Sequence, residues 1–376
     1  MSKIRVLRAI TWLPVGGIER RIVDVLPRLD RSRFEVSLVC LRERGPLADE
    51  LESAGIPVDV IRFRNRWDQR GLRQLARLMR EREIDVVHSQ MYRSNVPATV
   101  AARLAGKRHV WSQIHNVDSW DSRRQVAVDR WLCRWREGIL AVSEGVRRDA
   151  IEKLRLPAER VRVLYNGVDL SRFAPGGDRD SLRREIGVGE DDFVFLFAAR
   201  LVEQKRPQDF LELARRLLGS TAHRARGEPA RFWLAGDGKL RGELEAQAAS
   251  IAGHERIRFL GPRDDMPRVM AAADALVMTS TREGFSNSLL EALASGLAVI
   301  ATDVGGNAEA IRSGQDGLIV PPLDPEALWV AGRSVLDDAP LCDALRKNGR
   351  ERAQTFSVEA MVRNLEDLYE GSVRAR

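Results

Sequence analysis

Short apolar runs alternate with amphipathic segments along most of the chain. Runs rich in Val, Ile and Leu predict β-strands, and the segments between them have the three- and four-residue apolar spacing of helices. In the first half we expect strands at residues 3–10, 34–41, 85–88, 109–114, 138–142 and 161–164. A second series is expected at 193–197, 231–235, 256–260, 275–278, 298–300 and 317–320.

Two series of alternating strands and helices predict an α/β protein with two Rossmann-like, doubly wound domains that face a cleft. The length of 376 residues agrees with two domains. We place the first domain at 1–170 and the second at 171–355, with linker-like sequence at 173–178. The amphipathic segment 356–376 is expected to be a helix that packs against either domain, and one option is that it crosses back to the first.

The segment 281–293 places two acids, Glu283 and Glu291, around a predicted helix start. It follows the strand at 275–278, and Gly284 suits a turn. Amides at a helix N-terminus favour phosphate, so the backbone of residues 285–288 suits a diphosphate. Carboxylates do not bind phosphate directly, and hydroxyls of a sugar or ribose are their natural donors. The alternative is that one acid is a solvated loop residue and the other a helix-face residue.

Arg200 and Lys205 bracket a predicted strand-to-helix loop at the start of the second domain. Two cations there suit a diphosphate leaving group. The chain has only 6 lysines, so a lysine at this position is notable. In the first domain, Gly16 and Gly17 form a turn that opens a helix, where backbone can approach a ligand or simply turn. The turn matches neither the dinucleotide fingerprint nor a phosphate-binding P-loop.

Candidate histidines and metal ligands are few. His88 and His115 are placed at strand ends, where a cleft would open, although a structural role is the default for a single histidine. The three cysteines are far apart and lack metal spacing, which indicates reduced structural thiols. Asp178 and Asp180 match an Asp-x-Asp pattern, but helix capping explains them better. We therefore expect no catalytic metal and no cofactor.

Charge is unevenly distributed along the chain. Residues 1–165 hold 33 Lys and Arg against 21 Asp and Glu, a net +12, so the remainder carries −5 of the total +7. A basic first domain suits an anionic membrane surface or a phosphate-bearing acceptor, and solvated helix faces explain it equally well. An aromatic content of 6% and the lack of a recognition motif argue against nucleic acid. Without a membrane-length apolar run or a leader-like start, a cytoplasmic location is expected.

The order and spacing of these motifs resemble the retaining glycosyltransferases of GT-B fold, of the group 1 or family 4 kind that includes bacterial polysaccharide and lipid glycosyltransferases. The resemblance covers nearly the whole chain. It is carried by the following residues: Gly16 and Gly17, His115, the crossover 163–169, Arg200 with Lys205, the segment 235–238, and Glu283 with Glu291 in Glu-x7-Glu spacing.

The resemblance implies a role for each motif in binding a nucleotide sugar, and the expected donor is a UDP-sugar. Cations and amides would hold the diphosphate; Glu283 would contact the transferred sugar, Glu291 the ribose, and His115 the sugar near the reacting carbon. Backbone near 261–263 would hold the base, and loop 116–120 would help to choose the acceptor. The expected site residues are Gly16, Gly17, His115, Arg200, Lys205, Gly236, Arg263, Glu283, Gly284, Phe285, Ser286, Asn287, Ser288 and Glu291, of which His115, Arg200, Lys205 and Glu283 are the expected catalytic set.

The implied activity is transfer of a sugar to an acceptor hydroxyl with retention of configuration, in bacterial glycan or glycolipid synthesis. The expected location is the cytoplasm, with peripheral contact at the inner face of the cell membrane as an option. Two departures from the family pattern, Ala199 and Arg206 in place of glycines, concern the loop around Lys205, and Ser286 stands where proline is common. The alternatives are a nucleotide-sugar epimerase of the same fold and a non-catalytic protein that binds nucleotide sugars or glycans.

Overall fold

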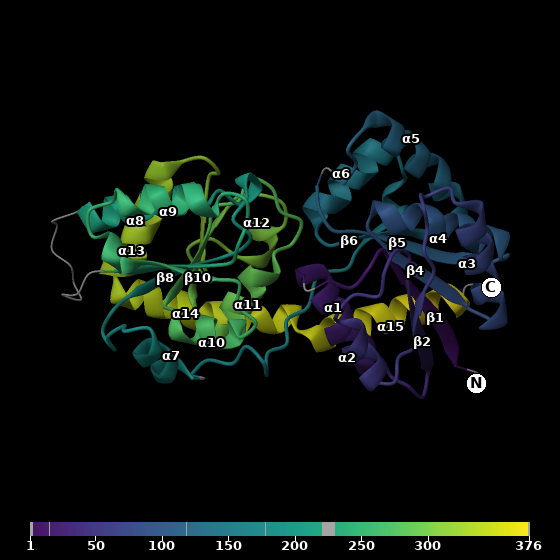
Figure 1. The fold of residues 1–376 in the computed structure, drawn as a ribbon, viewed down its shortest axis with the longest axis horizontal. Coiled ribbons are helices and arrows are strands. Elements are labelled where there is room, and N and C mark those ends of the chain that lie inside the picture. Colours follow the sequence, from purple (N-terminus) through teal and green to yellow (C-terminus); the bar gives the residue numbers. More distant parts are fainter. Residues whose placement is uncertain (1–2, 15, 118, 177, 220–229, 375–376) are drawn as a thin grey trace. The chain divides into compact units, whose positions relative to one another are not determined.

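The computed structural model describes residues 3–14, 16–117, 119–176, 178–219 and 230–374. The chain divides into two compact units, which are considered separately: unit 1 comprises residues 1–167 and 358–376, and unit 2 comprises residues 168–357. Both contain one sheet in which every strand pairing is parallel, with helices on both faces (Figure 1).

Unit 1 has a seven-stranded sheet in the order β3-β2-β1-β4-β5-β6-β7. Its strands are Ile4–Ile10 (β1), Phe34–Cys40 (β2), Val58–Val60 (β3), Val86–Gln90 (β4), His109–Ile114 (β5), Gly138–Ala141 (β6) and Val161–Val163 (β7). Its α-helices are Gly17–Val25 (α1), Ala48–Ser53 (α2), Gln69–Glu81 (α3), Tyr92–Leu104 (α4), Arg123–Leu132 (α5), Glu144–Leu154 (α6) and Val358–Arg374 (α15). The expected strands are all present, and β3 is an additional edge strand.

The apolar cores of unit 1 lie on the two faces of this sheet. One core joins β1 and β2 to α1, α2 and α15, and the other packs α3 and α4 on the opposite face (Figure 1). The C-terminal helix α15 thus belongs to unit 1, where Met361, Leu365 and Tyr369 are buried. The Tyr369 hydroxyl lies 2.7 Å from His88 Nδ1, and Ser372 accepts from the Trp111 indole at 2.9 Å.

Unit 2 has a six-stranded sheet in the order β10-β9-β8-β11-β12-β13. Its strands are Val194–Ala198 (β8), Arg231–Ala235 (β9), Ile257–Gly261 (β10), Ala275–Met278 (β11), Ala298–Thr302 (β12) and Leu318–Val320 (β13). Its α-helices are Arg179–Glu185 (α7), Pro207–Gly219 (α8), Arg241–Ala249 (α9), Met266–Ala272 (α10), Asn287–Ser295 (α11), Asn307–Ala310 (α12), Pro325–Asp337 (α13) and Ala339–Ala353 (α14). Helices α8, α9 and α13 cover one face, and α7, α10 and α11 the other (Figure 1).

The strand orders define one topological switch point in each unit. In unit 1 the chain leaves β1 towards β2 on one side, and β4 pairs on the other side. In unit 2, β8 has β9 and β11 as neighbours in the same way. Loops that follow the two strands at a switch point diverge, so the carboxyl ends of these strands are the usual binding edge of an open α/β sheet.

One local expectation is wrong. Helix α7 begins at Arg179, as the Asp178-x-Asp180 pattern suggested, but the Asp178 side chain makes no capping hydrogen bond. Its carboxylate instead accepts from Arg268 Nε at 2.8 Å. An ion pair to a neighbouring helix therefore takes the place of the cap.

Candidate functional site

Arg200, Lys205 and Glu283 all lie at the carboxyl ends of β8 and β11, the switch point of unit 2. The loop after β8 contains Arg200 and ends in a short 3-10 turn, Glu203–Lys205. The loop after β11 contains Glu283. Backbone hydrogen bonds join the two loops, because Thr281 N donates to Gln204 O at 2.9 Å. The parallel topology therefore brings the expected cations and one expected acid together.

Lys205 and Glu283 form an ion pair through Nζ and Oε1. The Lys205 side chain is 17% exposed and the Glu283 side chain 7%, so both are largely withdrawn from water. Ser280 Oγ donates to the same Glu283 oxygen at 2.7 Å. The Thr279 hydroxyl donates to the carbonyls of Lys205 and Arg206 at 2.9 and 2.7 Å, which fixes the end of the first loop. Arg206 adopts the left-handed conformation with φ of 51° although it is not a glycine.

Arg200 differs from Lys205 in its surroundings. Its side chain is exposed, and its guanidinium forms no ion pair or hydrogen bond with any residue in the described ranges. A solvated guanidinium in the same loop as the buried Lys205 is available to bind an anion at this edge of the sheet. Arginine matches phosphate geometry through its planar fork of donors.

Helix α11 begins directly after this loop and presents its N-terminus at the same edge. Ser286 is its N-cap, with Oγ accepting from Leu289 N at 3.4 Å. Phe285 is buried, and its ring packs against Phe356 with centroids 5.2 Å apart. Asn287 and Ser288 form the first turn, and the helix dipole makes this end favourable for negative charge. Glu291 lies one turn further along α11 and is half-buried.

Two glycines allow the surrounding loops to approach closely. A Cβ at Gly305, where φ is 57°, would overlap the carbonyl oxygen of Glu283, and Gly306 N donates to Gly284 O at 2.9 Å. A Cβ at Gly236, where φ is 137°, would overlap the carbonyl of Ala199. The loop after β12 therefore packs backbone to backbone against the loop after β11, and the loop after β9 packs in the same way against the loop after β8.

The loop after β10 contains Arg263, another expected site residue. Its guanidinium makes a bidentate pair with Asp265, at 2.7 and 2.6 Å. Gly261 accepts from Gly236 N at 2.8 Å, which ties this loop to the neighbouring one. The Arg263 side chain is thus engaged within its own loop, and the backbone is the part that remains for a ligand.

In unit 1, Gly16 is the N-cap residue of α1 and Gly17 is its first residue. No side chain caps this helix start. The carboxylate of Glu19 folds back towards Gly16, where a Cβ would come within 2.5 Å of its Oε2. Burial raises the pKa of Glu19. Sequence reasoning missed this acid, whose carboxylate would have to move away or take up a proton from water before an anion could bind at the Gly16–Gly17 turn.

His115 follows β5 at the carboxyl edge of the sheet of unit 1. The residue is half-buried, its Nε2 atom is buried, and this atom has no hydrogen-bond partner among the described residues. Burial, followed by the positive charge of Arg8, lowers the pKa of His115 to about 3. The imidazole is therefore neutral at physiological pH, so it can form a hydrogen bond with a ligand but not an ion pair.

Arg8 is a second residue that sequence reasoning missed. It is buried at 5% exposure and donates to Gln90 Oε1 at 2.8 Å and to the Tyr369 hydroxyl at 3.2 Å. His88 lies in the middle of β4, not at its end, and also contacts Arg8. Burial lowers the pKa of His88 well below its usual value, and Arg8 adds to this. His88 is thus a core residue.

The remaining expectations concern metals, thiols and membranes. Cys40, Cys133 and Cys342 are free and buried. No group of three His, Cys, Asp or Glu side chains among the described residues has the arrangement of a metal site. A search of the described helices finds none that combines the length and apolar character needed to cross a bilayer. In the loop 116–120, residue 118 is outside the described residues, and Trp120 donates to Asp129 at 2.9 Å.

Comparisons with known proteins agree with this architecture. The model of glycosyltransferase family 4 matches residues 15–172, and that of glycosyl transferases group 1 matches residues 178–352. The UDP-Gal:alpha-D-GlcNAc-diphosphoundecaprenol alpha-1,3-galactosyltransferase of Escherichia coli is 27% identical over 383 residues, which cover 98% of this chain and 97% of that enzyme. A D-inositol 3-phosphate glycosyltransferase of Geodermatophilus obscurus is 32% identical over 304 residues, 76% of this chain and 66% of that protein.

Solved structures show the same fold. Anabaena HepE in complex with UDP matches with a TM-score of 0.85 at 23% identity, and its complex with UDP-glucose with 0.84 at 22%. Each match covers 98% of this chain and 100% of HepE. At such identity the likeness concerns the fold alone. The family models, the relatives and the two parallel-sheet units lead to one conclusion: this chain belongs to the GT-B glycosyltransferases, with a family 4 region followed by a group 1 region.

Proposed function

We propose that this glycosyltransferase transfers a hexose from a UDP-sugar to a lipid-linked glycan, with retention of configuration and without a metal ion. The observation that carries the proposal is the Lys205–Glu283 pair at the carboxyl ends of β8 and β11, next to the exposed guanidinium of Arg200. Together with the N-terminus of α11, these groups offer positive charge for a diphosphate at one edge of unit 2. They also offer a carboxylate that can accept hydrogen bonds from sugar hydroxyls.

The donor diphosphate is assigned to Arg200, Lys205 and the amides at the start of α11. Lys205 carries one positive charge that Glu283 orients, so it stabilises the leaving diphosphate where negative charge develops. Glu283 accepts from hydroxyls of the transferred sugar, and Glu291 from those of the ribose. Gly17 and the neutral His115 of unit 1 are assigned to the phosphate and to the sugar. The E. coli relative uses UDP-galactose and HepE binds UDP, which supports a UDP-sugar here.

Retention is proposed from the resemblance to the retaining members of this family. The bond between the anomeric carbon and the diphosphate oxygen breaks, and the acceptor oxygen bonds to that carbon on the same face. The acceptor proton passes to an oxygen of the leaving phosphate. Glu283 Oε1 already accepts hydrogen bonds from Lys205 and Ser280. We therefore assign Glu283 to donor binding and not to the general acid and base pair that a glycoside hydrolase uses.

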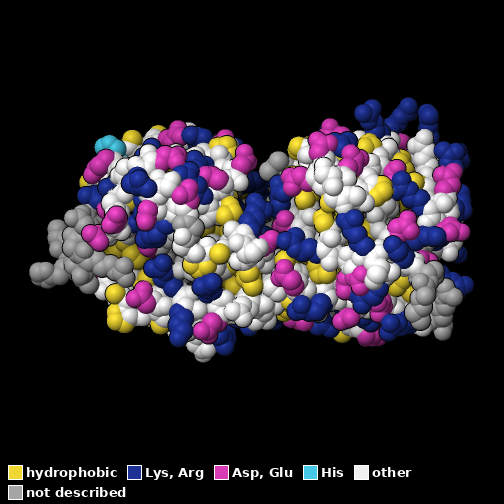
Figure 2. All heavy atoms as spheres, turned by 90° about the horizontal axis from the view of Figure 1, so that it is seen from below, with side chains coloured by type: hydrophobic (Ala, Val, Ile, Leu, Met, Phe, Trp, Pro, Cys, Tyr) yellow, Lys and Arg dark blue, Asp and Glu magenta, His cyan; other side chains and the backbone are white. Residues whose placement is uncertain are grey.

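A lipid-linked acceptor is supported by the E. coli relative, whose acceptor is a diphosphoundecaprenol-linked sugar. An acceptor of this class lies in a membrane, so we place the protein in the cytoplasm at the inner membrane face. On the face in Figure 2, Lys and Arg side chains are intermixed with Asp and Glu over both units, and a group of basic side chains stands at the upper edge of unit 1. Salt-sensitive co-sedimentation with anionic vesicles tests this location.

The function is tested by incubating the protein with UDP-galactose, UDP-glucose or UDP-N-acetylglucosamine and a lipid-diphosphate-linked sugar. One UDP-sugar should yield UDP and a glycosylated lipid in equal amounts, with full activity in EDTA. Proton NMR should show the α-configuration of the donor in the product. A β-linked product contradicts retention. UDP-sugar binding without UDP release points instead to a binding protein, and an epimerised nucleotide sugar to an epimerase.

A further inference from the structure

A hollow of about 600 Å³ opens at the carboxyl ends of β1 to β4 in unit 1. Thr11 follows β1, Arg42 follows β2, and Arg64 and Arg66 follow β3, while Arg93 lies in the first turn of α4 after β4. The hollow therefore spans the carboxyl ends of strands that include β1 and β4, the edge at which open α/β sheets bind ligands.

The charges in this hollow are of one sign. Four arginines line it, and none of the described residues that line it is acidic. Within the described ranges, Arg64, Arg66 and Arg93 take part in no ion pair, and Arg42 only approaches the exposed Glu43 at 3.8 Å. The Arg66 guanidinium lies over the Tyr92 ring, 5.0 Å from its centroid, which orients the cation without neutralising it. Such a cluster suits a ligand with several negative charges.

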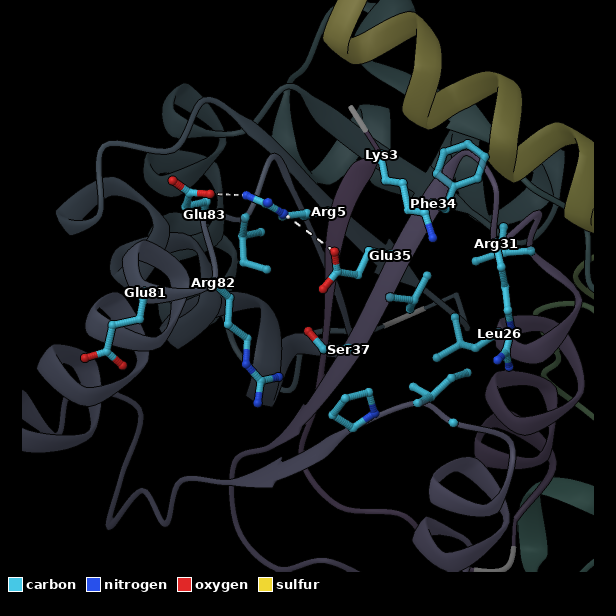
Figure 3. A pocket seen from close by; sticks show the side chains of 16 residues that line it. Lys3, Arg5, Leu26, Arg31, Phe34, Glu35, Ser37, Glu81, Arg82 and Glu83 are labelled. Carbon is cyan, nitrogen blue, oxygen red and sulfur yellow. Dashed lines mark hydrogen bonds and ion pairs between the residues drawn. The ribbon is translucent and has the colours of Figure 1, made fainter. Parts of the chain in front are cut away.

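A second hollow of similar size provides the contrast (Figure 3). It lies at the opposite edge of the same sheet, around the amino ends of β1 and β2, and also contains arginines. There Arg5 pairs with Glu83 and lies 3.6 Å from Glu35, and Arg82 pairs with Asp59 at 2.7 Å. In that hollow Arg5 and Arg82 are paired with acids, whereas at the carboxyl edge only Arg42 has an acidic partner among the described residues.

The carboxyl-edge hollow also has an apolar side. Phe63, Trp67 and Leu41 line it, and Trp67 is 49% exposed. The loop that carries Trp67 is held by Asp68, whose carboxylate accepts from the backbone N of Arg64 at 3.1 Å and caps α3. A rigid loop thus presents arginine and an exposed indole side by side, which suits a phosphate group that continues into a hydrocarbon.

We propose that this hollow binds the diphosphate that joins the acceptor sugar to its lipid, with the arginines on the phosphates and Trp67 against the first lipid carbons. The inference rests on the proposed function, which supplies an acceptor of this class. It assigns acceptor binding to Arg42, Arg64, Arg66 and Arg93, residues separate from those assigned to the donor.

The test is titration calorimetry with farnesyl diphosphate and with inorganic pyrophosphate, both in saturating UDP so that the donor site is occupied. Wild type should bind farnesyl diphosphate at least tenfold more tightly than pyrophosphate. The double variant Arg64→Gln/Arg66→Gln, and separately Arg93→Gln, should weaken farnesyl diphosphate binding at least tenfold. Arg77→Gln on the exposed face of α3 is the matched control and should bind like wild type.

Trp67→Ala separates the lipid from free phosphate as the ligand. It should weaken farnesyl diphosphate and leave pyrophosphate unchanged, and equal binding of the two ligands by wild type contradicts a lipid ligand. Farnesyl diphosphate affinity that is the same in wild type and in both arginine variants overturns the site, even if the enzyme transfers sugar. Arginine-dependent binding in a protein that transfers no sugar contradicts the proposed function instead.

Discussion

Lys205 and Glu283 lie 78 positions apart in the sequence, yet the ammonium of one donates to the carboxylate of the other. The contact exists because β8 and β11 are neighbours at the switch point of unit 2. Both side chains are mostly buried, so each depends on the other to offset the cost of leaving water.

This mutual dependence predicts a double-mutant effect on stability. Glu283→Gln leaves Lys205 charged and partly buried without its carboxylate, which should cost about 1–3 kcal/mol of unfolding free energy. Lys205→Met in the same background should restore part of that loss. Urea unfolding of the two single variants and the double variant measures the coupling. Strictly additive losses would show that the pair does not stabilise the loops.

Arg200 should contribute to turnover and not to stability. Its guanidinium is exposed and makes no ion pair or hydrogen bond with any residue in the described ranges. Arg200→Gln should leave the melting temperature within about 1 °C of wild type, since surface substitutions change stability little. Turnover should fall by about 10²–10³, the usual loss for one group that stabilises a leaving anion. Arg350→Gln on α14 is the matched control, and an equal effect of both variants on turnover would exclude Arg200 from the site.

Gly305 should be intolerant of a side chain for two separable reasons. It has φ of 57°, and a Cβ there would overlap the Glu283 carbonyl. Gly314 has φ of 78° but open space around the Cβ position. Gly314→Ala should therefore cost about 1–2 kcal/mol for the backbone conformation alone, and Gly305→Ala should cost more and also reduce turnover. Identical losses of stability and activity in the two variants would contradict the close approach.

His115 makes the pH dependence of stability testable. Burial and then Arg8 lower its pKa to about 3 in the folded protein, against 6.5 in an unfolded chain. Between these values only the unfolded state binds the proton, so stability falls as the pH drops below 6.5, by about 1.4 kcal/mol per pH unit. His115→Gln removes this contribution, and its stability should fall less steeply from pH 6.5 to pH 4.5 in urea unfolding. Parallel profiles for variant and wild type would show that the imidazole stays accessible to protons.

The fold could be predicted from sequence because its strands are apolar and well separated. The runs at 109–114 and 275–278 match β5 and β11 residue for residue. The strand β3 was missed because Val58–Val60 is a short edge strand that follows a proline. The extent of β4 was also misjudged, since Ser89 and Gln90, which lie beyond the expected strand 85–88, are polar but buried inside the sheet.

The site could be predicted only in part, because several of its contacts join residues that are far apart in the sequence. Arg200, Lys205 and Glu283 were proposed as site residues from their order and spacing, while the contact between Lys205 and Glu283 depends on a strand order that local patterns do not encode. Arg8 and Glu19 were missed because nothing in their local sequence marks them. The partner of Arg8 on α15, Tyr369, is 361 positions away, and only the tertiary structure joins them.

We propose that the donor diphosphate binds at the Lys205–Glu283 pair. Titration calorimetry of UDP into wild type, Lys205→Ala and Lys347→Ala tests it most directly, because Lys347 is an exposed lysine of α14 in the same unit. We expect Lys205→Ala to weaken UDP binding at least tenfold and Lys347→Ala to bind UDP like wild type. Equal UDP affinity in all three folded proteins would contradict it.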